Sequence, residues 1–254
     1  MVNENVWYII CIVFAVVVPY LICSINPAII AAKVKHGKDI REMGSGNPGL
    51  TNTLRTMGKG AALAVLLFDV LKGVISILLV IRFCFYVVDP ALYIESIDGV
   101  VFYFADIESK KLLFVWLAAL TSVLGHCYPI YYKFKGGKAV LVTVATLFVI
   151  DWISALILLS LFIIIVLVTK YVSLGSVIAA IAYPICVGLI SSVGLFSSYV
   201  YNIGGHYRIT WHYLYHPYYI MVFPVAIAAL LVFKHRGNIK RLFNGTEKKL
   251  GSKS

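Results

Sequence analysis

Apolar residues occur along this chain in long runs that are separated by short charged segments. Hydrophobic residues make up 61% of the sequence, and the stretches 7–32, 112–132 and 171–207 contain no Asp, Glu, Lys or Arg. About 20 apolar residues cross the hydrocarbon core of a bilayer as a helix, so these runs predict an integral membrane protein. Single membrane helices are expected over about 7–32, 60–84, 112–132, 173–196 and 217–234.

The run 139–169 is too long for one comfortable span and short for two, and Asp151 is its one charged residue. We therefore expect two short helices that turn at Asp151 and Trp152. The predicted fold class is an all-α integral membrane protein with seven transmembrane helices. The whole chain 1–254 is expected to form a single domain that ends in a basic cytoplasmic tail, 235–254.

Basic residues set the expected orientation. The chain has 22 Lys and Arg against 11 Asp and Glu, a formal charge of +11, and 17 of the 22 lie in segments 33–59, 133–138, 170 and 234–254. Cytoplasmic segments of membrane proteins are enriched in Lys and Arg, so the N-terminus is expected outside and the C-terminus in the cytoplasm. This bias, with anionic lipid headgroups, explains the positive charge, and we expect membrane lipids rather than nucleic acid as partners.

The first polar segment on the expected cytoplasmic side is GSGNPGLTNTLRTMGKG, residues 44–60. Glycines let backbone N–H groups approach an anion, hydroxyls add donors, and Arg55 offers a planar two-pronged donor for phosphate. A helix is expected to begin near Thr51, with its positive dipole end beside the loop. An ordinary glycine-rich turn is the alternative. The expected phosphate-binding residues are Gly44, Ser45, Gly46, Asn47, Thr51, Asn52 and Arg55.

The second segment is KFKGGKAV, residues 133–140. Gly136 and Gly137 can form a backbone concavity for an anion. The cations around it are Lys133, Lys135 and Lys138. Lysines that snorkel at a helix end are the alternative. His126, in the preceding predicted helix, is either a hydrogen-bonded core residue or a supporting residue of the site.

The third segment is HRGNIKRLFNGTEKKLG, residues 235–251. A basic helix attracted to anionic lipid would not need His235, Asn238 and Glu247, although such an anchor stays open as an alternative. Within the second predicted helix, Asp69 and Lys72 stand at i and i+3 and can pair. Charges inside a membrane are functional candidates, and a structural ion pair that locks helices explains them equally well.

The three segments together predict one cation-lined site at the inner membrane surface for a small anionic molecule with a lipid-like chain. An interfacial enzyme, a transporter or channel for an organic phosphate, and a lipid-binding scaffold all remain candidates. A transporter needs charged residues along a path through the bilayer, but nearly all the cations lie at one face, so an enzyme is favoured. The five cysteines have no CxxC spacing, and no metal site or disulfide framework is expected.

The ordered segments resemble the PlsY family of bacterial membrane acyl-phosphate:glycerol-3-phosphate acyltransferases. The resemblance rests on GSGNPGLTNTLRTMGKGAA with FDVLKG, on LGHCYPIYYKFKGGKAV, on TKYVSLGS and on HRGNIKRLFNGTE. It implies seven helices with the motifs facing the cytoplasm of a bacterial inner membrane. It also implies transfer of a fatty acyl group from acyl-phosphate to the 1-hydroxyl of glycerol 3-phosphate, giving lysophosphatidic acid and phosphate. No cofactor, metal or obligate protein partner is implied.

The resemblance also assigns residue roles. Ser45 and Arg55 would serve the glycerol phosphate site, Gly136 and Gly137 the acyl-phosphate, and Lys138 its phosphate. His235 and Asn238 would line the active site, while Glu247 matches a structural acid. Leu50, Ala139 and Gly237 depart from the family pattern, which usually has Ala, Gly and an acid there.

An acyl-phosphate is already activated, so direct attack by glycerol 3-phosphate without an acyl-enzyme is expected. Either His235 or a phosphate oxygen of the substrate would accept the proton, and the resemblance favours the substrate. Ser45 is expected to bind rather than to attack.

Overall fold

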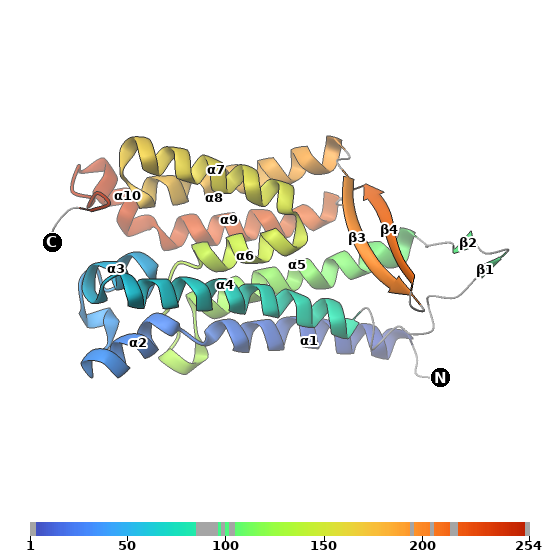
Figure 1. Ribbon diagram of the computed structural model, residues 1–254, viewed down its shortest axis with the longest axis horizontal. Helices are drawn as coiled ribbons and strands as arrows, with labels where there is room; N and C mark the ends of the chain where they lie inside the picture. The colour runs from blue at the N-terminus through green and yellow to red at the C-terminus, as the bar shows by residue number, and fades with distance from the viewer. Residues whose placement is uncertain are drawn as a thin grey trace.

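The structure, a computed structural model, describes residues 4–84, 96–97, 100–101, 105–193, 196–203, 206–213 and 218–251. Its long helices lie side by side along one axis (Figure 1). They are α1 (Glu4–Ser24), α4 (Lys59–Arg82), α5 (Ala105–Cys127), α7 (Trp152–Thr169), α8 (Val172–Val193) and α9 (Val222–Lys234). The shorter helices are α2 (Pro27–His36), α3 (Leu50–Met57), α6 (Val140–Ile150) and α10 (Arg236–Phe243), with 3-10 turns at Ile40–Glu42, Ile130–Tyr132 and Tyr218–Met221.

Within these described ranges, five helical segments are long and apolar enough to cross a membrane. They are Val6–His36, Lys59–Cys84, Leu112–Tyr132, Trp152–Thr169 and Val172–Ser192. A sixth is the pair Tyr218–Lys234 and Arg236–Phe243, if its 56° bend is counted within one span. The prediction of a helical fold with several membrane-length helices is thereby confirmed, while the seventh predicted span is not among these segments, because α6 has only 11 residues.

The first predicted helix, 7–32, is not continuous. α1 ends at Ser24, and α2 starts at Pro27 after a break at Ile25 and Asn26. Proline lacks an N–H and disfavours a helical conformation in the residue before it. Asn26 is extended instead, with φ −106° and ψ 106°, and its side-chain oxygen accepts the Ile29 N–H at 3.0 Å. Asn26 therefore acts as the N-cap of α2.

The turn expected at Asp151 within 139–169 is confirmed, since α6 and α7 meet there. Only α6, with 11 residues, is short, because α7 has 18 residues and is long enough to cross a membrane. The Asp151 carboxylate caps α7 by accepting the Ser154 N–H at 3.0 Å and the Ser154 hydroxyl at 2.5 Å. An aspartate in the middle of an apolar run thus provides the cap for a turn inside the bundle. α6 runs from the end of the bundle that carries α3 toward this turn, and α7 runs from the turn back toward that end (Figure 1).

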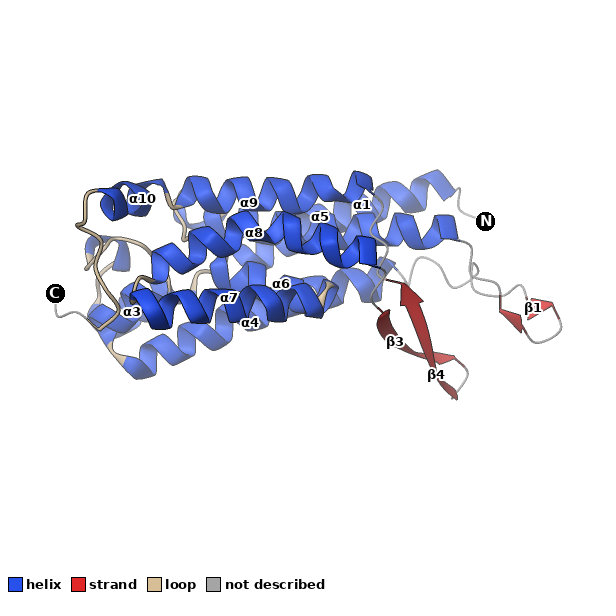
Figure 2. Cartoon of the chain, turned by 90° about the horizontal axis from the view of Figure 1, so that it is seen from above, coloured by secondary structure: helices blue, strands red, loops and turns tan. Residues whose placement is uncertain are grey.

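Strands were not expected in the segments 86–111 and 197–216. A long hairpin, β3 (Phe196–Ile203) and β4 (His206–Tyr213), pairs antiparallel, and a short pair, β1 (Ser96–Ile97) and β2 (Val100–Val101), precedes α5. The sequence places two glycines between β3 and β4, a recognised hairpin signal. α5 begins at Ala105, seven residues before the predicted start at 112. Both hairpins lie at the end of the bundle opposite α3 and α10 (Figures 1 and 2).

Candidate active site

A cavity of about 960 Å³ opens at the end of the bundle that carries α3 and α10. It brings together residues of all three polar segments. The predicted site residues that line it are Gly44, Ser45, Asn47, Thr51, Asn52, Arg55, Asp69, His126, Lys138, His235, Asn238 and Glu247. The predicted residues outside its lining are Gly46, Lys72, Lys135, Gly136 and Gly137. The expected convergence of distant segments is therefore present in the structure.

The first loop is organised by the Asn52 side chain. Its Oδ1 accepts the Ser45 N–H at 2.8 Å, and its Nδ2 donates to the Met43 carbonyl at 2.9 Å. Gly44 has φ +57°, and a Cβ there would lie 2.3 Å from Asn52 Oδ1. Asn52 was expected to bind phosphate, but its amide is used inside the loop, so its role is to hold the loop's shape. Gly46, at φ +72°, likewise donates its N–H within the loop, to the Met43 carbonyl.

The start of α3 faces the cavity. Gly49, Leu50 and Thr51 line it, and Arg55 follows one turn later. The first N–H groups of a helix have no acceptor within the helix, and they carry the positive end of its dipole. The predicted start near Thr51 is correct to within a residue. This terminus and the half-buried Arg55 together suit an anion.

A hydrogen-bonded chain crosses the cavity wall from the second segment to the third. Lys138 Nζ donates to Asn238 Oδ1 at 2.5 Å, and Asn238 Nδ2 donates to Glu247 Oε1 at 2.7 Å. Glu247 also accepts from the Ser173 hydroxyl at 2.5 Å and from Arg241 Nε at 2.7 Å. Glu247 thus fixes both the Asn238 amide and the Arg241 guanidinium. The structural role expected for Glu247 agrees with these contacts.

Two groups of this wall have shifted pKa values. Burial lowers the pKa of the Lys138 ammonium to about 8, although the Glu247 carboxylate acts in the opposite direction. Burial also raises the pKa of Glu247, but hydrogen bonds from Ser173, Asn238 and Arg241 outweigh it, and the net pKa is lowered. The pair therefore combines a cation whose pKa is about 8 with a carboxylate that stays charged at neutral pH.

His235 is buried where α9 meets α10. Burial and the nearby Lys138 charge lower its pKa to about 4, so the ring is neutral at pH 7. Its Nδ1 lies 2.7 Å from the Leu231 carbonyl, which can only accept a hydrogen bond. Nδ1 consequently carries the proton, and Nε2 of the neutral ring is an acceptor.

The glycine pair of the second segment has a different role from the one expected. The N–H groups of Gly136 and Gly137 donate to the carbonyls of Cys127 and His126, at 3.2 and 3.1 Å. A Cβ would lie 2.1 Å from the His126 carbonyl at Gly136 and 2.3 Å from His126 Nε2 at Gly137. Their donors are used internally, so the pair serves close packing on His126 rather than an anion. The exposed Lys135 lies outside the cavity.

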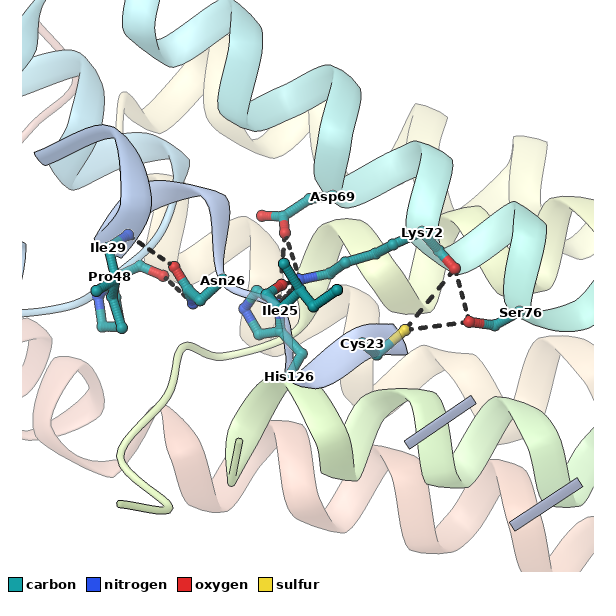
Figure 3. A network of polar contacts seen from close by, with 9 residues as sticks. All are labelled: Cys23, Ile25, Asn26, Ile29, Pro48, Asp69, Lys72, Ser76 and His126. Carbon is teal, nitrogen blue, oxygen red and sulfur yellow. Dashed lines mark hydrogen bonds and ion pairs between the residues drawn. The ribbon is translucent and has the colours of Figure 1, made fainter. Parts of the chain in front are cut away.

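Below the loops, a buried network joins α4, α5 and the break after α1 (Figure 3). Lys72 Nζ lies 2.7 Å from Asp69 Oδ1 and 3.0 Å from His126 Nδ1, and it donates to the Ile25 carbonyl at 2.9 Å. That carbonyl belongs to the C-terminal end of α1, whose negative dipole favours a cation. The pair predicted between Asp69 and Lys72 is present, and its contacts hold three helices together beneath the second segment.

Three groups of site residues were missed from the sequence. Arg241 resembles any other cation of the basic tail until its contact with Glu247 is seen. Arg41, three residues before the first segment, holds the start of the second, because its guanidinium donates to the Tyr132 and Lys135 carbonyls at 2.9 and 3.1 Å. The third group is an apolar limb of the cavity, formed by one face each of α6, α7 and α8.

Among the described residues, no group of three His, Cys, Asp or Glu lies close enough to hold a metal ion.

The fold and the cavity define a helical membrane protein with a cation-rich pocket that continues into an apolar limb. A family model described as glycerol-3-phosphate acyltransferase matches residues 13–245. A glycerol-3-phosphate acyltransferase of Chlorobaculum tepidum is 37% identical over 240 residues, which cover 92% of this chain and 94% of that protein. One of Clostridioides difficile is 35% identical over 237 residues, 93% of this chain and 94% of the relative.

Solved structures agree with the sequence matches. The crystal structure of PlsY (YgiH), an integral membrane glycerol 3-phosphate acyltransferase, in its glycerol 3-phosphate form superposes with a TM-score of 0.69 at 29% identity and covers 94% of this chain and 96% of that chain. Its lysophosphatidic acid form gives a TM-score of 0.64 at 27% identity, with 96% and 95% covered. The chain belongs to the glycerol-3-phosphate acyltransferase family typified by PlsY.

Proposed function

We propose that the chain transfers a fatty acyl group from acyl-phosphate to the 1-hydroxyl of sn-glycerol 3-phosphate, releasing lysophosphatidic acid and phosphate as the first acylation of phospholipid synthesis. The observation that carries this proposal is one cavity that joins a cationic end to an apolar limb. An acyl-phosphate has a charged head and an apolar tail, and it fits such a cavity in one orientation.

The cationic end would hold two phosphate groups. Arg55 and Ser45, with the start of α3, are assigned to glycerol 3-phosphate. Lys138 is assigned to the acyl-phosphate, because its ammonium is half-buried and is oriented by Asn238. A charged donor that is held in place before the reaction stabilises developing negative charge without reorganisation.

The reaction would be a direct displacement. The 1-hydroxyl oxygen attacks the acyl carbonyl carbon, a new C–O bond forms, and the bond from that carbon to the phosphate oxygen breaks. The hydroxyl proton passes to an oxygen of the departing phosphate. His235 Nε2 is the other candidate acceptor, but a pKa of about 4 makes it a weak base. No cofactor or metal is required, because the donor is already a mixed anhydride.

The same proposal includes the membrane arrangement. We take α6 as the seventh membrane-inserted helix, with the N-terminus outside and the C-terminus in the cytoplasm of a bacterial inner membrane. The basic segments 33–59, 133–138 and 234–254 support this orientation. The cavity would then open at the cytoplasmic surface, where glycerol 3-phosphate is dissolved.

An organic-phosphate transporter is the competing function. A transporter needs a polar path across the bilayer. The deep part of this cavity is instead lined by Leu147, Ala155, Leu158 and Tyr183. The apolar deep end favours the acyltransferase.

The test is acylation by the purified protein in detergent, with palmitoyl phosphate and labelled glycerol 3-phosphate as substrates and lysophosphatidic acid as the readout. Wild type should be active with palmitoyl phosphate and inactive with palmitoyl-CoA. Arg55→Ala should lower activity at least about 100-fold because it removes a charged phosphate contact. The control Lys38→Ala, at an exposed cation outside the cavity lining, should be unaffected. Uptake of glycerol 3-phosphate into sealed vesicles without acylation would support the transporter instead.

A further inference from the structure

The apolar limb of the cavity has a definite length. On α8 its lining residues follow one helical face from Ser173 through Ser176 and Ala180 to Tyr183. Ten residues of α-helix extend about 15 Å. An extended alkyl chain advances roughly 1.3 Å per carbon, given C–C bonds of about 1.5 Å. The limb therefore holds about a dozen carbons beyond the level of Ser173.

The deep end is closed by buried side chains from three helices. The α6–α7 turn at Asp151 brings the last lining residue of α6, Leu147, near the first lining residue of α7, Ala155. Tyr183 of α8, which is 2% exposed, lies opposite them. Its ring packs against Trp116 of α5, with 6.5 Å between ring centroids. Because the Tyr183 ring is packed against the fully buried Trp116, it cannot move easily and limits the length of the limb.

From this geometry we infer that Tyr183, with Ala180 and Leu158 beside it, sets the length of the acyl chain that the enzyme accepts. The inference rests on the proposed function, since it assumes that the limb holds the donor's acyl chain. A chain that is too long must displace Tyr183 or withdraw the phosphate head of the donor from Lys138. A chain that is too short leaves a void along the limb.

The discrimination between acyl chains of different length comes from how well each chain fills the limb, rather than from the free energy of its transfer out of the bilayer. The acyl tail leaves one apolar environment, the bilayer or the micelle, for another, so the gain per methylene is small. An unfilled methylene volume costs about threefold in the relative rate. A chain forced against a packed end costs about tenfold. The expected result is a peak in chain preference rather than a steady rise with length.

The test is an internal competition. Purified protein receives an equimolar mixture of dodecanoyl, myristoyl, palmitoyl and stearoyl phosphate with limiting glycerol 3-phosphate, and the lysophosphatidic acids are separated by mass. Product ratios report relative kcat/KM, and they do not depend on how much of a variant is folded. Tyr183→Ala and Leu158→Ala should shift the products toward longer chains, with the stearoyl-to-myristoyl ratio rising about tenfold for Tyr183→Ala. Ala180→Leu should shift them toward shorter chains.

Two variants serve as controls. Ile181→Ala makes a large truncation two residues from Tyr183, but Ile181 is 54% exposed and lies outside the cavity lining. Its product ratios should equal those of wild type, and so should those of Tyr183→Phe, which keeps the ring. Unchanged ratios in Tyr183→Ala, Leu158→Ala and Ala180→Leu, while product still forms, would overturn the inference and leave the proposed function intact. Absence of product from wild type with every acyl-phosphate would instead refute the proposed function.

Discussion

Replacing Glu247 by Gln should change the pH at which the enzyme loses activity. The Glu247 carboxylate lies beyond the Asn238 amide from Lys138, and the two hydrogen bonds that connect them are 2.5 and 2.7 Å long. The ammonium and the carboxylate are therefore about 7 Å apart, where two unit charges interact by roughly 2 kcal/mol at an effective dielectric of about 20. Solvent near the exposed Arg241 screens this interaction, so we take about half of that energy as the effective interaction between the two charges.

The size and sign of the shift follow from that interaction. The Lys138 pKa is already lowered to about 8 by burial, and Glu247 opposes the lowering. Removal of the carboxylate charge should lower the Lys138 pKa by about one further unit, because 1.36 kcal/mol corresponds to one unit. Lys138 must be charged to hold phosphate, so activity is present below this pKa and is lost as the pH rises through it.

The assay is kcat/KM for palmitoyl phosphate between pH 6 and 9.5, which reports the ionisation of the free enzyme. Wild type should lose activity with a midpoint near pH 8, and Glu247→Gln with a midpoint about one unit lower. Glu42→Gln, at an exposed acid of the turn Ile40–Glu42, is the charge-matched control and should behave as wild type. An unchanged alkaline midpoint in Glu247→Gln would refute the assignment of Lys138 as the titrating cation.

Three further changes test the supporting structure. Lys72→Met leaves the buried Asp69 without its cation and should lower the free energy of unfolding by about 3–5 kcal/mol. Thermal unfolding in detergent measures this loss. Adding Asp69→Asn to the variant should restore part of the lost stability. Gly137→Ala forces a Cβ to 2.3 Å from His126 Nε2 and should raise KM for the acyl-phosphate at least about tenfold, so an unchanged KM would contradict the packing role. Ala139 has φ +58°, so Ala139→Gly should raise the unfolding temperature by relieving about 1 kcal/mol of strain, and a lower temperature would contradict this.

The helices could be predicted from the sequence because bilayer thickness fixes the length of an apolar run. The α6–α7 turn could also be predicted, since Asp151 is the one charged residue in its run and caps a helix there. The break after α1 was missed, because Asn26 and Pro27 interrupt a run without changing its hydropathy. The β3–β4 hairpin was missed although two glycines marked its turn, because β3 continues the uncharged stretch of α8 and Arg208 is the one Lys, Arg, Asp or Glu in either strand.

The convergence of the three polar segments could be predicted because the basic residues assign all of them to one side of the membrane. The roles of single residues could not. A loop glycine such as Gly137 serves equally for an N–H donor or for close packing, and only the contact with His126 decides between them. The apolar limb has no signal of its own, since a helical face that lines a cavity has the same composition as one that faces lipid.

The central claim is that both phosphorylated substrates occupy one cavity together and react directly. Initial rates measured while both palmitoyl phosphate and glycerol 3-phosphate are varied test it most directly. The account predicts double-reciprocal lines that intersect, and no burst of phosphate from palmitoyl phosphate alone. Parallel lines, or a stoichiometric burst of phosphate before glycerol 3-phosphate is added, would indicate an acyl-enzyme and would contradict the account.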